Sequence, residues 1–255
     1  MSSKENNFKE QFKQALISTA KVISDDFKLD IKKLDKDFDS KKIDFFDVTN
    51  LTSKQDFIRL RAETDSAALK RKFSNKKIFN KNLPNNPSCK SLYNIAEKIR
   101  YEVLGMKMLK GIEKNLNENY KKKINSTNRN QLKNKEDVPV IEAFELYMLK
   151  KFLNIKLNDV SSKILSFWEK DFNTSIEKHI DFLSKNLEDQ NNYSSKFSEI
   201  LENMEVFNSD NEENKDNADD NKNEQENNSE SSDNNQSDGQ EESKQDEAPS
   251  SLDTG

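Results

Sequence analysis

Residues 91–120 read SLYNIAEKIRYEVLGMKMLKGIEKNLNENY, and this stretch decides the fold class. Apolar residues recur along it at every third or fourth position, which places them on one side of an α-helix. The spacing predicts one long amphipathic helix from about Ser91 to Tyr120, with its apolar side packed on other helices. That apolar stripe consists of Leu92, Ile95, Ile99, Val103, Met106, Leu109, Ile112 and Leu116.

Helices are also predicted on both sides of this stretch. The clearest start signal is Ser53 followed by Asp56, a capping box that opens a helix ending at Phe73. Residues 82–88, NLPNNPS, interrupt the helical pattern, and KKKINSTNRNQLKNK at 121–135 is predicted to be a basic loop. The other predicted helices run from after the cap candidates Ser2 and Ser3 to about Ser24, from the cap Asp137 with Pro139 in the first turn through Phe152, from about Asn158 to Lys185, and from about Gln190 to Glu205.

One short segment has a different pattern. FKLDI and KKIDFF alternate apolar with polar residues, which is typical of strands, and they are separated by a polar stretch. This predicts a β-hairpin at about residues 27–48, with its tip near Lys36 to Ser40. The fold class is therefore mainly α: one helical domain over residues 1–207 with one small β-hairpin.

The charge is distributed unevenly between this domain and the residues after it. Residues 208–255 contain sixteen Asp/Glu, three lysines and few apolar residues, so their formal charge is −13. Residues 1–207 contain 39 Lys/Arg and 31 Asp/Glu, a formal charge of +8. A segment so polar cannot bury enough apolar surface to offset its ordering entropy, and we predict that residues 208–255 form a disordered acidic linker or tail.

Motifs for catalysis or cofactor binding are not found in the sequence. It has no phosphate-binding loop, and its single histidine, His179, cannot form a two-histidine zinc site. DNNQSDG in the acidic segment does not match the glycine and glutamate positions of an EF-hand loop. Cys89 is the only cysteine, and no apolar run reaches the roughly 18 residues of a membrane span, so we expect a cytoplasmic protein. No catalytic, cofactor-binding or metal-ligating residue is predicted.

The predicted long helix contains two glycines, Gly105 and Gly111, which each cost roughly 1 kcal/mol relative to alanine inside a helix. Close packing of another backbone is the expected reason. Glu97 and Arg100 are three residues apart and are predicted to form a surface or half-buried ion pair. Trp168, the single tryptophan, is predicted to lie in the core, with an interface anchor as the alternative.

Several ordered stretches together resemble the N-terminal region of CobT, a subunit of aerobic, ATP-dependent cobaltochelatase. No single stretch carries the resemblance, but their order and the acidic segment that follows them match the family. RAETDSAALK matches at Arg61, Asp65, Ser66, Ala68 and Leu69; AEKIRYEVLGMKMLKGIEKNL matches at Glu97, Arg100, Glu102, Gly105, Gly111, Asn115 and Leu116; FWEKDF and LEDQNNYSSKFSEILENM match at Trp168, Asp189, Gln190, Phe197 and Leu201.

The resemblance implies a non-catalytic adaptor in a nitrogen–metal ligase. In that family CobT assembles with the AAA+ ATPase subunit CobS into a hetero-oligomeric ring, which works with the large corrin-binding subunit CobN. The complex uses ATP and magnesium to insert cobalt into hydrogenobyrinic acid a,c-diamide during cobalamin synthesis. It also implies a C-terminal von Willebrand factor A-like domain, for which this sequence has no ligand motif, so we expect the chain to correspond to the N-terminal part of the subunit. The candidate docking residues are Arg61, Asp65, Glu97, Arg100, Glu102, Gly105, Gly111 and Trp168.

Two alternatives follow from charge rather than from the resemblance. The basic body and the lysine-rich stretch 121–135 could bind nucleic acid without sequence specificity. The acidic segment could make the chain a metal-buffering or solubilising protein. A specific nucleic-acid partner and a membrane are not expected.

Overall fold

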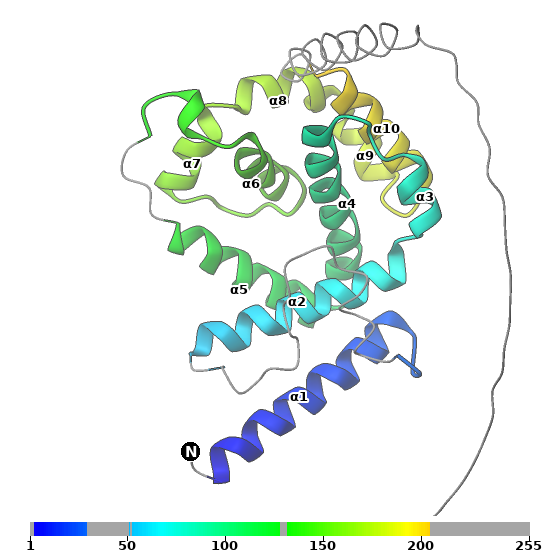
Figure 1. Ribbon diagram of the computed structural model, residues 1–255, viewed down its shortest axis with the longest axis vertical. Coiled ribbons are helices and arrows are strands. Elements are labelled where there is room, and N and C mark those ends of the chain that lie inside the picture. The colour runs from blue at the N-terminus through cyan, green and yellow to red at the C-terminus, as the bar shows by residue number, and fades with distance from the viewer. Residues whose placement is uncertain (1–2, 30–50, 52, 128–131, 205–255) are drawn as a thin grey trace, which may run out of the picture. The chain divides into compact units, whose positions relative to one another are not determined.

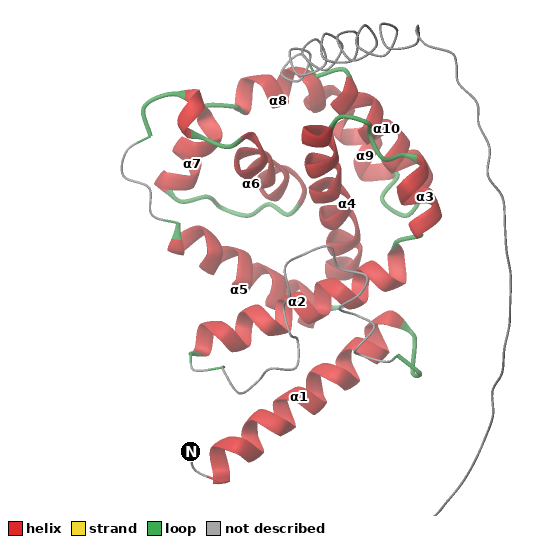
Figure 2. Cartoon of the chain, viewed as in Figure 1, coloured by secondary structure: helices red, strands yellow, loops and turns green. Residues whose placement is uncertain are grey.

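Helices make up all the regular structure in the part of the chain that the structure describes (Figure 1, Figure 2). The computed structural model describes residues 3–29, 51, 53–127 and 132–204, which all fall within one compact unit, residues 1–212. The mainly α fold class is confirmed. The elements are α1 Ser3–Ser24, α2 Lys54–Phe73, α3 Lys76–Lys81, α4 Pro87–Met108, α5 Lys110–Ser126, η4 Lys135–Asp137, α6 Val140–Phe152, α7 Asp159–Ser166, α8 Glu169–Ile176, η5 Glu177–His179, α9 Ile180–Lys185 and α10 Gln190–Glu202.

The prediction of a single helix over residues 91–120 is wrong, because this stretch contains parts of two helices, α4 and α5. Leu109 lies between them with an extended backbone, φ −140° and ψ 121°. Its N–H donates to Gly105 O at 3.0 Å, and its carbonyl accepts from Ile112 N at 3.0 Å, so one residue ends α4 and begins α5. The bend directs the apolar side of α5 onto α2. A one-residue break leaves the apolar spacing on either side unchanged, so the sequence pattern does not reveal it.

The other predicted boundaries are partly right. Ser53 and Asp56 form the predicted capping box: Asp56 N donates to Ser53 Oγ, and Ser53 N donates to Asp56 Oδ2 at 2.9 Å. Asp137 does not cap α6. Its carboxylate accepts the backbone N–H groups of Lys133 and Asn134, just before η4. Helix α6 begins later, after Pro139.

Two further predictions require correction. Part of the predicted basic loop is helical, because α5 continues to Ser126. The predicted helix from about Asn158 to Lys185 is divided into α7, α8, η5 and α9, with Phe167 and Trp168 between the first two. The predicted hairpin at about 27–48 lies almost wholly outside the described residues, and residues 27–29 form a turn and a loop. The predicted acidic tail, residues 208–255, also lies outside them.

Helix α4 is central to the packing, because it contacts α2, α5, α6 and α10 (Figure 1). Aromatic rings fill the region between α6, α8 and α10. Phe144 packs edge-to-face on Phe172 and on Phe197, at ring-centroid distances of 5.5 and 6.1 Å. All three side chains are fully buried, and burial of each contributes roughly 1.5–3 kcal/mol. Because Phe197 is on α10, which also packs on α4, this core holds one of the helices that form the site described next.

Candidate docking surface

Glu97 and Arg100 form the ion pair that the sequence predicts, but its location differs from the prediction. Arg100 Nε donates to Glu97 Oε2 at 2.8 Å, and Arg100 Nη2 donates to Glu97 Oε1 at 2.9 Å. The side chains are 1% and 3% exposed, so the pair is buried rather than on the surface. A buried charge is tolerated only when its remaining donors and acceptors are also satisfied.

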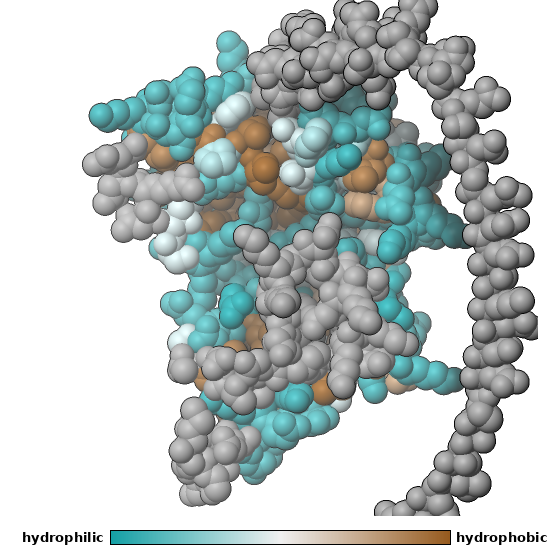
Figure 3. All heavy atoms as spheres, in the orientation of Figure 1, coloured by the Kyte–Doolittle hydropathy of each residue, from teal (hydrophilic) through white to brown (hydrophobic). Residues whose placement is uncertain are grey.

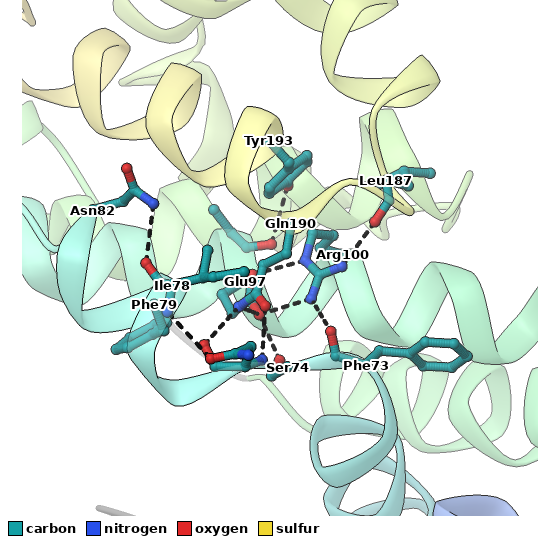
Figure 4. Close-up of polar contacts among 12 residues, drawn as sticks. Phe73, Ser74, Ile78, Phe79, Asn82, Glu97, Arg100, Leu187, Gln190 and Tyr193 are labelled. Carbon is teal, nitrogen blue, oxygen red and sulfur yellow. Dashed lines mark hydrogen bonds and ion pairs between the residues drawn. The ribbon is translucent and has the colours of Figure 1, made fainter.

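Two other parts of the chain, the end of α2 and the segment at the start of α10, satisfy them (Figure 4). Arg100 donates to Phe73 O at 2.6 Å, at the end of α2, and to Leu187 O at 2.8 Å, before α10. Glu97 Oε1 accepts from Ser74 Oγ and from Gln190 Nε2 at 2.9 Å. These six residues, which we call the Arg100 network, are Phe73, Ser74, Glu97, Arg100, Leu187 and Gln190. The network joins the end of α2, the middle of α4 and the start of α10.

A surface groove lies directly beside the Arg100 network. It has a volume of about 740 Å³, and Gln190 connects it to the network by accepting the Asn75 N–H at 2.7 Å. Lys72 is among its lining residues from the α2 side, and the acidic residues Glu188 and Asp189 line it from the segment before α10. The α2–α10 groove is lined by Lys72, Phe73, Ser74, Asn75, Ile78, Glu188, Asp189, Gln190 and Asn191.

A second, smaller hollow of about 460 Å³ shares Phe73 and Glu188 with the α2–α10 groove. Its other lining residues are Leu104, Lys107 and Met108, near the end of α4. Met108 is 38% exposed, so an apolar side chain is accessible at this end. The two hollows together offer a partner both apolar and oppositely charged contacts.

Glu102 is the centre of a second buried network. Its two carboxylate oxygens accept from Ser66 Oγ on α2 at 2.6 Å and from the Tyr120 hydroxyl on α5. Burial raises the pKa of Tyr120 well above its ordinary value, and the Glu102 charge adds to this, so the phenol keeps the proton that it donates. This second network joins α2, α4 and α5.

Asp65 lies in the contact between α2 and α5. Asn115 Nδ2 donates to its Oδ2 at 2.7 Å, whereas Oδ1 is buried with no hydrogen-bond partner. Burial raises the pKa of Asp65, and the Asn115 hydrogen bond and the Arg61 charge offset only part of that rise. Arg61 itself is exposed.

The two glycines differ. A Cβ on Gly105 would lie 2.9 Å from Leu69 Cγ and closer still to both Leu69 methyl carbons, so α2 packs tightly against this position, although through a side chain rather than the predicted backbone. A Cβ on Gly111 would meet nothing within 4 Å, and the close-packing prediction is wrong there.

Trp168 is half-buried and packs against the core. Its indole Nε1 donates to Val138 O at 3.0 Å, and its ring stacks on Phe172 at 6.4 Å between centroids. Lys135 Nζ lies 4.1 Å from the ring centroid and also pairs with Asp171 at 2.9 Å. Contacts of this kind fix the indole in place on both sides.

Comparison with known proteins gives the family. The model of the family described as cobalamin biosynthesis protein CobT matches residues 6–254. The chain belongs to the CobT family. No solved structure matches it. Membership in the CobT family gives the chain a role in cobalamin biosynthesis, as part of a cobaltochelatase. Among the described helices, none is long and apolar enough to cross a membrane.

The geometry separates the predicted docking residues of this CobT-family chain into two groups. Arg61 and Gly111 are exposed and Trp168 is half-buried. The other five are buried, so they do not offer their side chains to a partner in this conformation: Asp65, Glu97, Arg100, Glu102 and Gly105. They instead join the helices that form the surface. Sequence reasoning did not single out the groove residues Lys72 and Glu188, but the matching residues Asp189 and Gln190, within the resembling stretch LEDQNN, do line the groove.

Proposed function

We propose that this CobT-family chain acts as a non-catalytic adaptor, which docks on the AAA+ subunit CobS and couples it to the large subunit CobN. The family supports the cobaltochelatase context. The observation that carries the adaptor role is the α2–α10 groove, which lies beside a buried ion-pair network. In the complex the cobalt ion is a substrate, and ATP with magnesium belongs to the ATPase subunit.

A docking module that couples two partners must keep its binding surface in one shape. The Arg100 network supplies this rigidity, because Arg100 on α4 donates to the backbone carbonyls of Phe73 and Leu187, which lie at or next to the two segments that line the groove. Movement of either helix end would leave a buried charge without its hydrogen bonds, which is costly. A rigid surface that fits one nucleotide state of the ATPase better than another shifts the population of those states.

The groove also offers a basis for specificity. Lys72 and the acidic residues Glu188 and Asp189 line the groove from two sequence-distant segments, so a partner needs charges of matching arrangement to bind. Phe73 lines both hollows and supplies an aromatic anchor of the kind enriched at binding hot spots. The complementary surface on CobS would thus combine an apolar side chain with charges of both signs.

Charge reversal in the groove tests this proposal. Lys72 and Glu188 are exposed, so Lys72→Glu and Glu188→Lys leave the core intact. Each is expected to weaken binding of the full chain to CobS by about tenfold or more, the scale of a hot-spot residue. Lys163→Glu, on the exposed side of α7, is the matched control and should leave the affinity unchanged. Calorimetric titration with CobS gives the affinities, and circular dichroism shows whether each variant is folded. Unchanged affinity in both folded groove variants would rule out this surface.

A further inference from the structure

A basic surface adjoins the α2–α10 groove, and the groove alone does not account for it. Residues 66–96 contain seven Lys/Arg and no Asp or Glu. Arg71 pairs with Asp26 at 2.7 Å, and Lys70 and Lys90 are half-buried. Four exposed lysines remain, and we call them the α3 basic surface: Lys72, Lys76, Lys77 and Lys81.

The four lysines form no ion pair within the part of the chain that the structure describes. Other exposed lysines differ in this respect, since Lys123 and Lys150 each pair with a glutamate. Helix α5 is also rich in lysine, but Glu113 and Glu118 alternate with its cations. In Figure 3 the surface over α3, at the right of the view, is hydrophilic. The α3 basic surface is thus a concentration of positive charge without a described counter-charge.

The α3 basic surface is continuous with the α2–α10 groove. Lys72 belongs to both, and Ile78 of α3 also lines the groove. Helix α3 packs on α10, whose first residues line the groove as well, and Asn82 Nδ2 donates to Asn191 Oδ1 at 3.5 Å between these two helices. A partner seated in the groove therefore lies next to the lysines of α3.

We propose that CobS carries an acidic run next to the segment that occupies the groove, and that this run binds the α3 basic surface. The inference rests on the proposed docking function and adds the chemistry of the partner to it. Charge complementarity is the argument, because exposed cations without a counter-charge attract a run of carboxylates and speed its encounter. Single exposed ion pairs are weak, so the run needs several Asp or Glu to bind all four lysines.

The lining of the groove favours an acidic polypeptide over a nucleic acid as the occupant. Phe73 and Ile78 are half-buried there and offer an apolar contact, which suits a side chain and not a phosphate backbone. Glu188 and Asp189 line the same groove and would repel phosphates, which a nucleic acid carries at every nucleotide. A polypeptide can place a cation against these two acids and its carboxylates over α3.

The rate at which the full chain associates with CobS, measured by stopped flow at several salt concentrations, tests this inference. The triple variant Lys76→Gln, Lys77→Gln, Lys81→Gln changes exposed side chains outside the groove lining, so the fold and the groove should be retained. It should associate roughly tenfold more slowly than the parent at low ionic strength. At about 1 M salt, where the Debye length is about 3 Å, the two rates should be equal. The matched triple variant Lys110→Gln, Lys114→Gln, Lys121→Gln on α5 removes the same charge and should stay within about twofold of the parent.

Equal association rates of the α3 and α5 variants at low salt would overturn the inference. If Lys72→Glu and Glu188→Lys weaken CobS binding and the α3 variant does not change its rate, the docking function stands and the acidic run is refuted. If neither set of variants changes binding, the docking function fails and the inference falls with it. Loss of random-sequence duplex DNA binding in the α3 variant, with CobS association unchanged, would assign the surface to nucleic acid instead.

Carbodiimide cross-linking of the parent complex gives a second readout that needs no variant, because the reagent joins a lysine amine directly to a carboxylate. Mass spectrometry should find Lys76, Lys77 and Lys81 joined to Asp or Glu residues of one continuous stretch of CobS. Cross-links scattered over the surface of CobS, or more frequent from the α5 lysines than from the α3 basic surface, would contradict the inference.

Discussion

Replacing Arg100 by methionine removes the cation from the Arg100 network while preserving much of the side chain's length. Glu97 would keep its bonds from Ser74 and Gln190 but lose the only cation paired with it in the described structure. The carbonyls of Phe73 and Leu187 would each lose a donor. Removing one partner of a buried ion pair costs about 3–5 kcal/mol, because the other charge stays buried without compensation.

This loss is large relative to the total stability of a domain, about 5–15 kcal/mol. For a unit of this size each kcal/mol lowers the melting temperature by about 2–4 °C, so Arg100→Met should melt about 6–20 °C lower. Urea unfolding followed by circular dichroism measures the free energy directly. The control is Lys150→Met, which removes an exposed cation paired with Glu169 and should cost about 0–1 kcal/mol.

Two further variants separate charge from packing. Arg100→Lys keeps the charge, but the lysine amine has no planar fork and cannot reach Glu97 and both carbonyls together. Its free energy of unfolding should therefore lie between those of the parent and Arg100→Met. The double variant Glu97→Met, Arg100→Met removes both buried charges and should be less destabilised than the sum of the single variants. If Arg100→Met cost less than about 1 kcal/mol, the assignment of Arg100 as the link between these helix ends would be refuted.

Three more outcomes follow. Gly105→Ala forces the new Cβ against the buried Leu69 side chain and should destabilise the fold by about 1–3 kcal/mol. At Gly111 the new Cβ meets open space, so Gly111→Ala should stabilise the fold by up to about 1 kcal/mol. Urea unfolding compares the two variants. The raised pKa of Asp65 means that the folded state binds its proton more tightly than the unfolded chain, so the ionised carboxylate lowers stability above its folded pKa. Asp65→Asn should therefore be more stable than the parent at neutral pH, and this difference should vanish as the pH falls toward the ordinary value of 3.8; a difference independent of pH would refute the reasoning. Trp168→Phe loses an indole hydrogen bond to a backbone carbonyl and should cost about 1–2 kcal/mol by thermal melting without changing CobS affinity.

The sequence predicts helices well where the signal is local. The capping box at Ser53 and the apolar spacing of α1 and α10 depend only on residues a few positions apart, and the structure confirms them. The break at Leu109 has no local signal, because it is associated with the packing of α5 on α2, which is a contact between distant segments.

The candidate site shows the same division. The pair Glu97 and Arg100 is readable from its spacing, but its burial is not, since that depends on Phe73 and Leu187, whose contribution is a backbone carbonyl that any residue has. The groove could not be predicted either, because its walls come from segments more than a hundred residues apart. What the resembling residues encode is mainly the internal frame of the helical unit.

The central claim is that the groove of this CobT-family chain binds the AAA+ subunit. Hydrogen–deuterium exchange of the full chain, with and without CobS and in the presence of ATP or ADP, tests it most directly. The account predicts slower exchange at residues 72–78 and 188–191 when CobS is bound, with a difference between the two nucleotides, and little change on α7. A folded chain that showed no protection in these residues with either nucleotide would contradict it.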